Sequence, residues 1–183
     1  SINAFAAPGG IIGITLGMFL NTKREGELAS VMCHELAHLS QRHYARSQNR
    51  NSPLANALMI LGSIAVAAAS RNPEAIVIAP AAMQQMSINY TRSNEKEADR
   101  IGFNNLVKAG FDPNDMTMMF QRMQDKYQRE DSEQFSYLMT HPLPSERLTD
   151  MRIRADNISK PSDGSFRDNL DFYFMQKRSE IWA

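Results

Sequence analysis

Two histidines four residues apart, with a glutamate directly after the first, are the side chains of this sequence best suited to do chemistry. They are His34, Glu35 and His38, within His-Glu-Leu-Ala-His. In a helix, residues four apart lie about 40° from each other around the axis and about 6 Å apart along it, so both imidazoles can bind one metal ion. Glu35 lies about 100° round from His34, where it can hold a metal-bound water. On a helix, this motif is typical of zinc hydrolases.

The segment around the motif has the pattern of a helix. Thr22 and Glu25 have the spacing of a capping box. Apolar residues then recur with a helical period, which predicts one buried face and an opposite face that carries the histidines. These residues are Leu28, Met32, Leu36 and Leu39. Because no Gly or Pro interrupts residues 27–51, we expect both histidines on one rigid helix; the alternative is a surface helix with two stray histidines.

A catalytic zinc site usually has three protein ligands and leaves a fourth position for water. Residues 94–102 contain the best third ligand, because Glu95 and Asp99 lie four apart on one face of an expected helix. We predict that Glu95 binds the metal and that Asp99 accepts a hydrogen bond from the distal ring nitrogen of a ligand histidine. Glu97 is the competing ligand. It has the capping-box spacing to Asn94, which favours a structural role, so we prefer Glu95.

Together these motifs resemble the zinc peptidase family that includes the CAAX prenyl proteases and the heat-shock protease HtpX, and most closely its soluble periplasmic branch. The resemblance rests on the His-Glu-Leu-Ala-His motif, on Glu-Lys-Glu-Ala-Asp-Arg at 95–100, and on Thr-His-Pro-Leu-Pro at 140–144 with Arg147. It extends from Asn3 to Tyr173, almost the whole chain. Taken jointly, the motifs are highly specific.

The resemblance implies one Zn²⁺ per chain with three ligands, His34, His38 and Glu95. It makes Glu35 the general base of peptide-bond hydrolysis and Asp99 the acid that supports a metal-bound histidine. It also implies an α+β, mainly α, zincin-like fold, in which a small N-terminal β-hairpin packs beside the helix of the zinc motif.

His141 and Arg147 are further catalytic candidates. The tetrahedral intermediate of hydrolysis needs a hydrogen-bond donor besides the metal, and His141, Arg147 or Tyr90 could supply it. In the family, a histidine at the position of His141 can instead occupy the open metal position and restrain activity. Without the resemblance, the place of His141 before Pro142 favours a simple turn residue.

The N-terminal residues predict a β-hairpin. A weakly alternating segment meets a Pro-Gly-Gly turn at 8–10 and then the β-type run 11–16. By the resemblance, the strand with Asn3, Ala4 and Phe5 flanks the active-site helix, and its free edge would pair with an extended substrate. An ordinary edge strand is the structural alternative.

Composition bounds the remaining classes of function. The chain has 183 residues, 43% of them hydrophobic, and a formal net charge of zero, so it can bury a substantial core and no nucleic-acid partner is expected.

The single cysteine of the chain, Cys33, excludes an internal disulfide. Cys33 lies about 100° from His34, which makes it a buried apolar residue and a poor zinc ligand. The chain begins at Ser1 without a signal peptide, and we interpret this as removal of upstream sequence.

Two apolar stretches, 54–69 and 75–86, lie between the metal motifs. Each is too short for a transmembrane helix, which needs about 20 apolar residues. We interpret them as core helices. The alternative is a mobile or membrane-facing lid, with peripheral membrane contact through residues 54–86.

Three further helices are expected beyond residue 110. The first starts after Asp112 and Pro113, the second covers 145–157, and the third, 170–182, follows a linker at 160–165. The first two have inward faces that repeat with a helical period. These faces contain Met116, Met119, Phe120, Met123 and Tyr127, and Leu148, Met151 and Ala155, respectively.

The sequence therefore predicts a zinc-dependent endopeptidase domain at residues 1–158, truncated at its N-terminus, and a linker with a helical tail at 159–183. The resemblance implies a bacterial periplasmic protein that cleaves misfolded or stalled outer-membrane proteins, with the outer-membrane assembly machinery as a partner and His141 as a self-inhibiting ligand. A chaperone or scaffold module with a permanently closed zinc site is the alternative function.

Overall fold

The structure is a computed structural model that describes residues 1–7, 9–50, 75–129, 136–159 and 165–181, with Leu61, Ala65 and Ala69. The contacts divide the chain into two compact units. The first unit contains residues 1–41 and 96–183, and the second contains residues 42–95. The border falls inside one unbroken helix, directly after Glu95.

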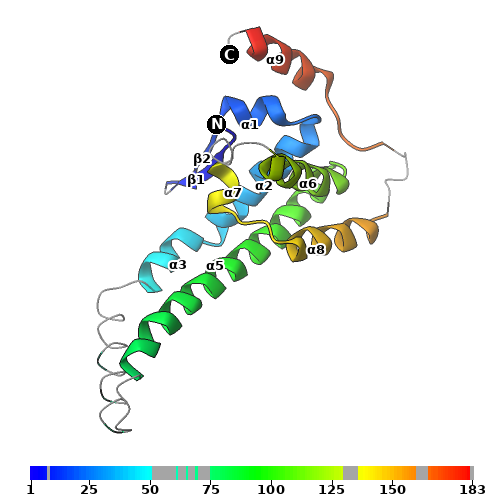
Figure 1. The fold of residues 1–183 in the computed structure, drawn as a ribbon. Helices are drawn as coiled ribbons and strands as arrows, with labels where there is room; N and C mark the ends of the chain where they lie inside the picture. Colours follow the sequence, from blue (N-terminus) through cyan, green and yellow to red (C-terminus); the bar gives the residue numbers. More distant parts are fainter. Residues whose placement is uncertain are drawn as a thin grey trace. The chain divides into compact units, whose positions relative to one another are not determined.

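The fold is mainly helical, with one N-terminal hairpin (Figure 1). The first unit contains β1 (Ala4–Ala7), β2 (Ile11–Ile14), α1 (Leu16–Asn21), α2 (Glu25–Ser40), α6 (Asn114–Arg129), α7 (Ser136–Thr140), α8 (Ser145–Asp156) and α9 (Leu170–Ile181). The second unit contains α3 (His43–Arg50), and α5 (Ala75–Lys108) passes from the second unit into the first. This architecture confirms the predicted α+β, mainly α fold.

β1 and β2 form the expected antiparallel hairpin. Its turn contains Gly9 and Gly10 at φ +94° and +83°, a left-handed conformation that glycine adopts without the steric cost of a side chain. The β run predicted to reach residue 16 ends at Ile14. The reason is Thr15, whose hydroxyl accepts a hydrogen bond from the backbone N–H of Met18 and so begins α1.

The capping box predicted from Thr22 and Glu25 is wrong. The Thr22 hydroxyl donates to a carbonyl in the last turn of α1, and the N-cap of α2 is Arg24, whose side chain makes no capping bond. Glu27 takes this role, because its carboxylate accepts a hydrogen bond of 2.5 Å from the backbone N–H of Lys23. An acid in the first turn also suits the positive end of the helix dipole.

The run of residues 27–51, which no Gly or Pro interrupts, does not form one helix. α2 ends at Ser40, and α3 begins at His43. Between them Arg42 has φ +53°, the left-handed conformation in which helices commonly end. The rigid element is therefore α2 alone, and it still carries the complete His-Glu-Leu-Ala-His motif.

The buried face of α2 is the one that carries the metal motif. His34 and Glu35 are 0% and 1% exposed, whereas Met32 and Leu36 of the predicted core stripe are 42% and 46% exposed. The prediction from the apolar pattern failed because α6 covers the polar face of α2. The centroid of the Phe120 ring of α6 lies 6.1 Å from that of the His34 ring. Figure 1 shows α2 and α6 side by side in the first unit.

α6 and α8 build the core beneath the motif. α6 begins after Asp112 and Pro113 as predicted, with the Asp112 carboxylate accepting a hydrogen bond from the backbone N–H of Asn114. The predicted stripe of α6 is buried at Met116, Met119, Phe120 and Met123, but Tyr127 is 39% exposed. The predicted inward residues of α8, Leu148, Met151 and Ala155, are all buried.

α9 confirms the helix expected at the C-terminal end and packs on α1. The rings of Phe172 and Phe19 meet edge to face at 5.4 Å. The Gln176 side chain donates to the carbonyls of Phe19 and Thr22.

The described helices include none with the length and hydropathy of a membrane span. The stretch 54–86, proposed as core helices or a membrane contact, lies almost entirely outside the described side chains.

One acidic side chain is buried where the N-terminal ends of α2 and α6 meet. Asp115 is 0% exposed, and its Oδ1 lies 3.0 Å from Nη1 of Arg24. Its other oxygen packs against Gly26, so closely that a Cβ on the glycine would lie 1.9 Å away. Burial raises the pKa of Asp115 to about 7 despite the opposing charge of Arg24, and the nearby carboxylates of Asp112, Glu27 and Asp168 contribute in the same direction.

Replacing Asp115 by Asn should therefore remove a pH-dependent loss of stability. The folded pKa of about 7 exceeds the value of about 3.9 for an exposed aspartate, so the folded protein binds this proton more tightly. Wild-type stability then falls as the pH rises from about 4 to about 7, by at most about 4 kcal/mol from this group. Urea unfolding at pH 5 and pH 8 measures the loss.

Asp115→Asn should flatten this dependence, whereas Asp156→Asn, at an exposed position, should leave it as in the wild type. Equal pH dependence in wild type and Asp115→Asn would contradict the assignment.

Candidate metal centre

Four side chains each bring one potential ligand atom to a common point, and these atoms lie within 4.8 Å of one another. They are His34 and His38 on α2, Glu95 on α5, and His141 directly after α7. His34 and Glu95 are buried, and the other two are half-buried. The structure thus brings together the three ligands expected from the sequence and the histidine expected at the open position. Glu97, the competing carboxylate, is not in the cluster.

The donor set fits a zinc ion. The Nε2 atoms of His34 and His38 lie 3.0 Å apart, near the separation of about 3.3 Å between two nitrogen ligands of a tetrahedral zinc with bonds of about 2.05 Å. Imidazole and carboxylate ligands also suit zinc better than calcium or magnesium, which prefer oxygen alone. His34, His38 and Glu95 would hold the ion as protein ligands, with the side chain of His141 within reach.

Glu35 lies beside this cluster without belonging to it. Its side chain is 1% exposed, and its Oε1 atom makes no hydrogen bond with the part of the chain that the structure describes. The Nε2 atom of His141 lies 3.5 Å from this oxygen. A buried carboxylate oxygen without a donor is unfavourable, so this atom is suited to accept a proton from a group that enters the site.

Asp99 orients the first ligand histidine. Its Oδ1 lies 3.0 Å from Nδ1 of His34, which places the ring proton on Nδ1 and leaves the Nε2 lone pair for the metal. Nε and Nη2 of Arg147 donate to the two oxygens of Asp99 at 2.6 and 2.7 Å. Burial alone would raise the pKa of Asp99, but the hydrogen bonds from Arg147 and His34 outweigh it and hold the pKa below its usual value.

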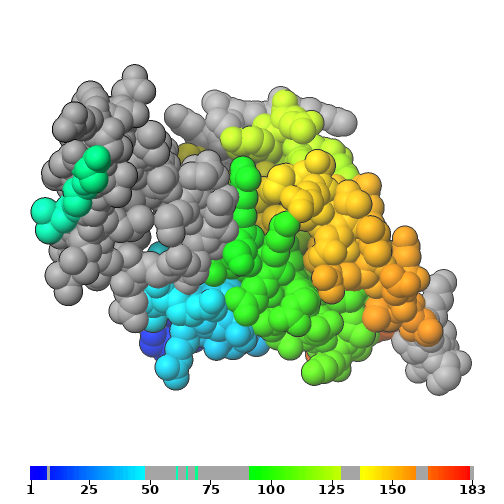
Figure 2. All heavy atoms as spheres, turned by 90° about the horizontal axis from the view of Figure 1, so that it is seen from below, coloured from blue at the N-terminus to red at the C-terminus, as the bar shows by residue number. Residues whose placement is uncertain are grey.

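Arg147 ties α8 to α5 and to the segment that carries His141. It is 3% exposed, and its Nη1 donates to the carbonyl of Pro142 at 2.7 Å, so its donor nitrogens are engaged within the protein. Figure 2 shows α8, in orange, against the green part of α5. On the exposed side of this contact, Lys96 donates to Glu146 at 2.6 Å.

Gly102 sets the distance between α5 and α2, a role that the sequence reasoning missed. A Cβ at this position would lie 3.0 Å from both Cα and N of His34. Glu95, Asp99 and Gly102 follow at i, i+4 and i+7, on one face of α5. The close approach of the two backbones lets the short Asp99 side chain reach the His34 ring. A glycine inside a helix, which costs stability unless the packing needs it, was the available signal.

Helix α7 places His141 next to the two ligand histidines. Its ring centroid lies 5.2 Å from that of His34 and 5.1 Å from that of His38. Its backbone N–H donates to the carbonyl of Tyr137, and the two rings lie 4.7 Å apart. Sequence reasoning did not single out Tyr137. The place of His141 before Pro142 favoured a simple turn residue. Because His141 lies in the ligand cluster, it has a role at the metal site as well.

The proposed substrate strand lies against the same helix. β1 packs on α2, with Ala4 buried and Phe5 48% exposed. Phe5 pairs with Gly13 in β2. The carbonyl of Asn3 accepts a hydrogen bond from the backbone N–H of Thr15, and the backbone N–H of Asn3 donates to the Thr15 hydroxyl. Within the described ranges, β1 has no strand partner besides β2. The side chain of Tyr90, the remaining candidate oxyanion donor, lies outside the described residues.

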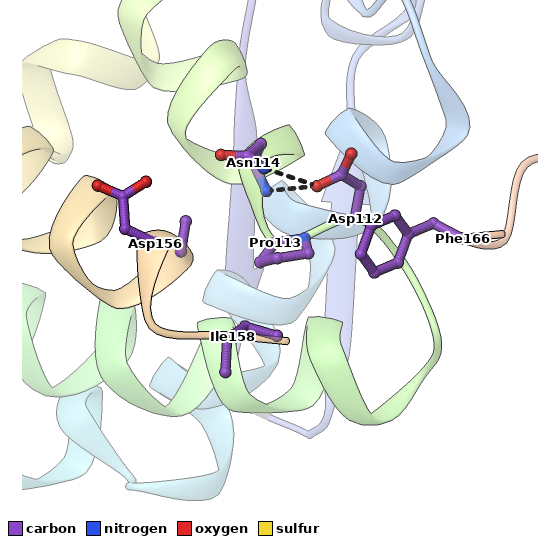
Figure 3. A pocket seen from close by; sticks show the side chains of 7 residues that line it. Asp112, Pro113, Asn114, Asp156, Ile158 and Phe166 are labelled. Carbon is purple, nitrogen blue, oxygen red and sulfur yellow. Dashed lines mark hydrogen bonds between the residues drawn. The ribbon is translucent and has the colours of Figure 1, made fainter. Parts of the chain in front are cut away.

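A pocket of about 360 Å³ lies away from this chemistry, between the start of α6 and the end of α8. Figure 3 shows its mixed lining, in which Asp112 bonds to Asn114 and the apolar side chains of Pro113, Ile158 and Phe166 lie nearby. None of the clustered ligands lines it. The lining residues are Asp112, Pro113, Asn114, Ala155, Asp156, Ile158 and Phe166.

Comparison with known proteins points to a single peptidase family. The profile of peptidase family M48 matches residues 1–155. The putative beta-barrel assembly-enhancing protease of Vibrio cholerae is 51% identical over 160 residues, which cover 85% of this chain and 33% of that protein. The beta-barrel assembly-enhancing protease of Escherichia coli K12 is 40% identical over 97% of this chain and 37% of its own length.

A mitochondrial relative is also similar. The metalloendopeptidase OMA1 of Schizosaccharomyces pombe is 30% identical over 146 residues, 80% of this chain and 41% of that protein. The chain spans about a third of the length of the bacterial relatives it matches. The similarity to them therefore concerns the peptidase portion.

Replacing Asp99 by Asn should weaken zinc binding about 10- to 100-fold, the usual effect of removing the acid that supports a metal-bound histidine. Competition with a chromophoric chelator measures the affinity. Glu146→Gln is the matched control, because it breaks an exposed ion pair between the same two helices and such pairs contribute little. An equal loss of affinity in both variants would mean that Asp99 acts only by joining the helices.

Adding a methyl group at Gly102 should push α5 away from α2. Overpacking of this kind typically costs about 1–3 kcal/mol, and we expect Gly102→Ala to lower both the melting temperature and the zinc affinity. Asn104→Ala, at an exposed position of the same helix, controls for the change in helix propensity. A Gly102→Ala variant that binds zinc as tightly as Asn104→Ala would refute the role of this close approach.

Proposed function

The chain belongs to peptidase family M48, and from this membership we propose that it is a zinc-dependent endopeptidase that hydrolyses misfolded or stalled outer-membrane proteins in the bacterial periplasm. The observation that carries the proposal is the cluster of His34, His38 and Glu95 with the buried carboxylate of Glu35 beside it. The substrate class and the compartment rest on the bacterial relatives, which are named for β-barrel assembly.

Glu35 performs the proton transfers of hydrolysis. A zinc ion held by the cluster would polarise the scissile carbonyl and lower the pKa of a bound water. Glu35 accepts the proton of the attacking water and delivers it to the amine nitrogen as the C–N bond breaks. Its buried position supports both transfers, because electrostatic interactions are stronger in a site that excludes water.

Arg147 contributes by positioning other groups. Its hydrogen bonds to Asp99 and to the Pro142 carbonyl engage the guanidinium, which favours this role over direct stabilisation of the oxyanion. His141 lies closer to the reacting atoms, since its Nε2 atom is 3.5 Å from Glu35. We therefore assign the oxyanion contact to His141 when that residue is not bound to the metal.

The N-terminal strand supplies the contact to the polypeptide substrate. An extended chain would pair with the free edge of β1, in the segment of Asn3, Ala4 and Phe5. The N–H and carbonyl of Asn3 are bonded to Thr15, so the backbone of Ala4 provides the hydrogen bonds, which do not depend on the substrate sequence. Such binding suits unfolded polypeptides. The exposed ring of Phe5 adds an apolar contact at this edge.

His141 restrains the enzyme in its resting state. With His141 the cluster offers four protein ligand atoms, a complete tetrahedral set that leaves no position for water. An imidazole that ligates the metal cannot also donate to an oxyanion, so catalysis requires His141 to leave. The same observation favours the second candidate function, a chaperone or scaffold in which the site stays closed.

Turnover of an unfolded outer-membrane β-barrel protein separates these functions. We expect Glu35→Gln to lower turnover by about 10²-fold or more, because general acid–base catalysis contributes that much, without reducing zinc content. We expect His141→Ala to cleave faster than the wild type, because an open fourth metal position is required for any turnover and this gain outweighs the loss of the oxyanion contact from His141. Measured cleavage rates and zinc content check both expectations.

If wild type and His141→Ala are as inert as Glu35→Gln while all three proteins bind zinc, the endopeptidase proposal is wrong and the scaffold function replaces it.

A further inference from the structure

We propose that Tyr137 is the positioning residue that keeps His141 in the metal cluster. The proposal rests on the restraint assigned to His141 above and deepens it by naming the side chain that maintains it. In this account, the Tyr137 ring supports one face of the imidazole, and its burial fixes the short helix from which His141 projects.

The ring contact is close and the tyrosine is immobilised. The ring centroids of Tyr137 and His141 lie 4.7 Å apart, with an angle of 31° between the planes, within the range of a favourable aromatic pair. Tyr137 is 1% exposed and is among the largest fully buried side chains of the described residues. Its ring centroid is also 6.5 Å from that of His34, so it reaches into the site without belonging to the ligand set.

The backbone of Tyr137 joins the His141 segment to the N-terminal strand. Its carbonyl accepts the backbone N–H of His141 at 2.9 Å, and its own N–H donates to the carbonyl of Ile2 at 3.3 Å. The hydroxyl of Thr140 bonds to the same carbonyl of Tyr137. Tyr137 is therefore fixed to the residues just before β1, and His141 is fixed to Tyr137.

Helix α7 cannot hold this arrangement by itself. It contains five residues, and so short a helix gains too few internal hydrogen bonds to be stable in water. Its position depends on the burial of Tyr137 and Leu138, which are 1% and 9% exposed, while Met139 is 68% exposed. Of the two buried side chains, Tyr137 is the one whose ring contacts His141.

A double-mutant cycle on zinc affinity tests the proposal without relying on cleavage. The variants are Tyr137→Leu, which keeps an apolar side chain but removes the ring, and Tyr137→Phe, which keeps the ring. Each is made in the wild type and in His141→Ala, and zinc affinity is measured by chelator competition. Thermal unfolding of each apo variant shows that the chain is folded.

We expect Tyr137→Leu to weaken zinc binding about three- to tenfold, the range that an aromatic pair can supply, and Tyr137→Phe to bind as the wild type. In the His141→Ala background, Tyr137→Leu should cause no further loss, because its effect passes through His141. Any general loss of stability is common to both backgrounds and cancels. The absorption spectrum of the cobalt-substituted protein should change alike in Tyr137→Leu and His141→Ala, since both reduce the ligation by His141.

The possible failures are distinguishable. If His141→Ala leaves zinc affinity and the cobalt spectrum unchanged, the restraint by His141 is wrong. If His141→Ala changes both but Tyr137→Leu changes neither, or lowers affinity equally in both backgrounds, the positioning role of Tyr137 is overturned. A loss in Tyr137→Phe equal to that in Tyr137→Leu would overturn the role of the ring contact.

Discussion

The buried carboxylate of Asp99 is the interaction on which the rest of the site depends. It lies between the ring of His34 and the guanidinium of Arg147, and so joins α2, α5 and α8. A charge with 1% of its side chain exposed is stable only when paired and hydrogen-bonded. Because Arg147 also binds the Pro142 carbonyl, the same pair places the segment that carries His141.

The motif helix is fixed at its other end by a second set of buried charges. Glu27 in the first turn of α2 accepts a bidentate pair of hydrogen bonds from Arg122 of α6 and caps the backbone at Lys23. Asp115 packs beside it, against Gly26. α2 is therefore held both at its start and at its ligands, as a preorganised metal site requires. This anchoring explains why polar residues form the buried face of this helix.

The parts of the site that depend on local geometry could be predicted from the sequence, and those that depend on tertiary partners could not. The spacing of His34 and His38, and the phase of Glu95 with Asp99, follow from the helix period, and the structure brings all four together. The core face of α2 was wrongly predicted at Met32 and Leu36, because the apolar pattern assumes that polar residues face water. The engagement of Arg147 and the close approach at Gly102 depend on helices distant in sequence.

Crystallography of the metal-loaded chain, with anomalous scattering at the zinc edge, would identify the zinc ligands and so decide whether His141 closes the metal site. We expect one zinc bound by His34, His38 and Glu95, with His141 as the fourth ligand and Glu35 unbound beside it. Zinc held by a different carboxylate, or a water in the fourth position with His141 turned away in the resting protein, would contradict this expectation.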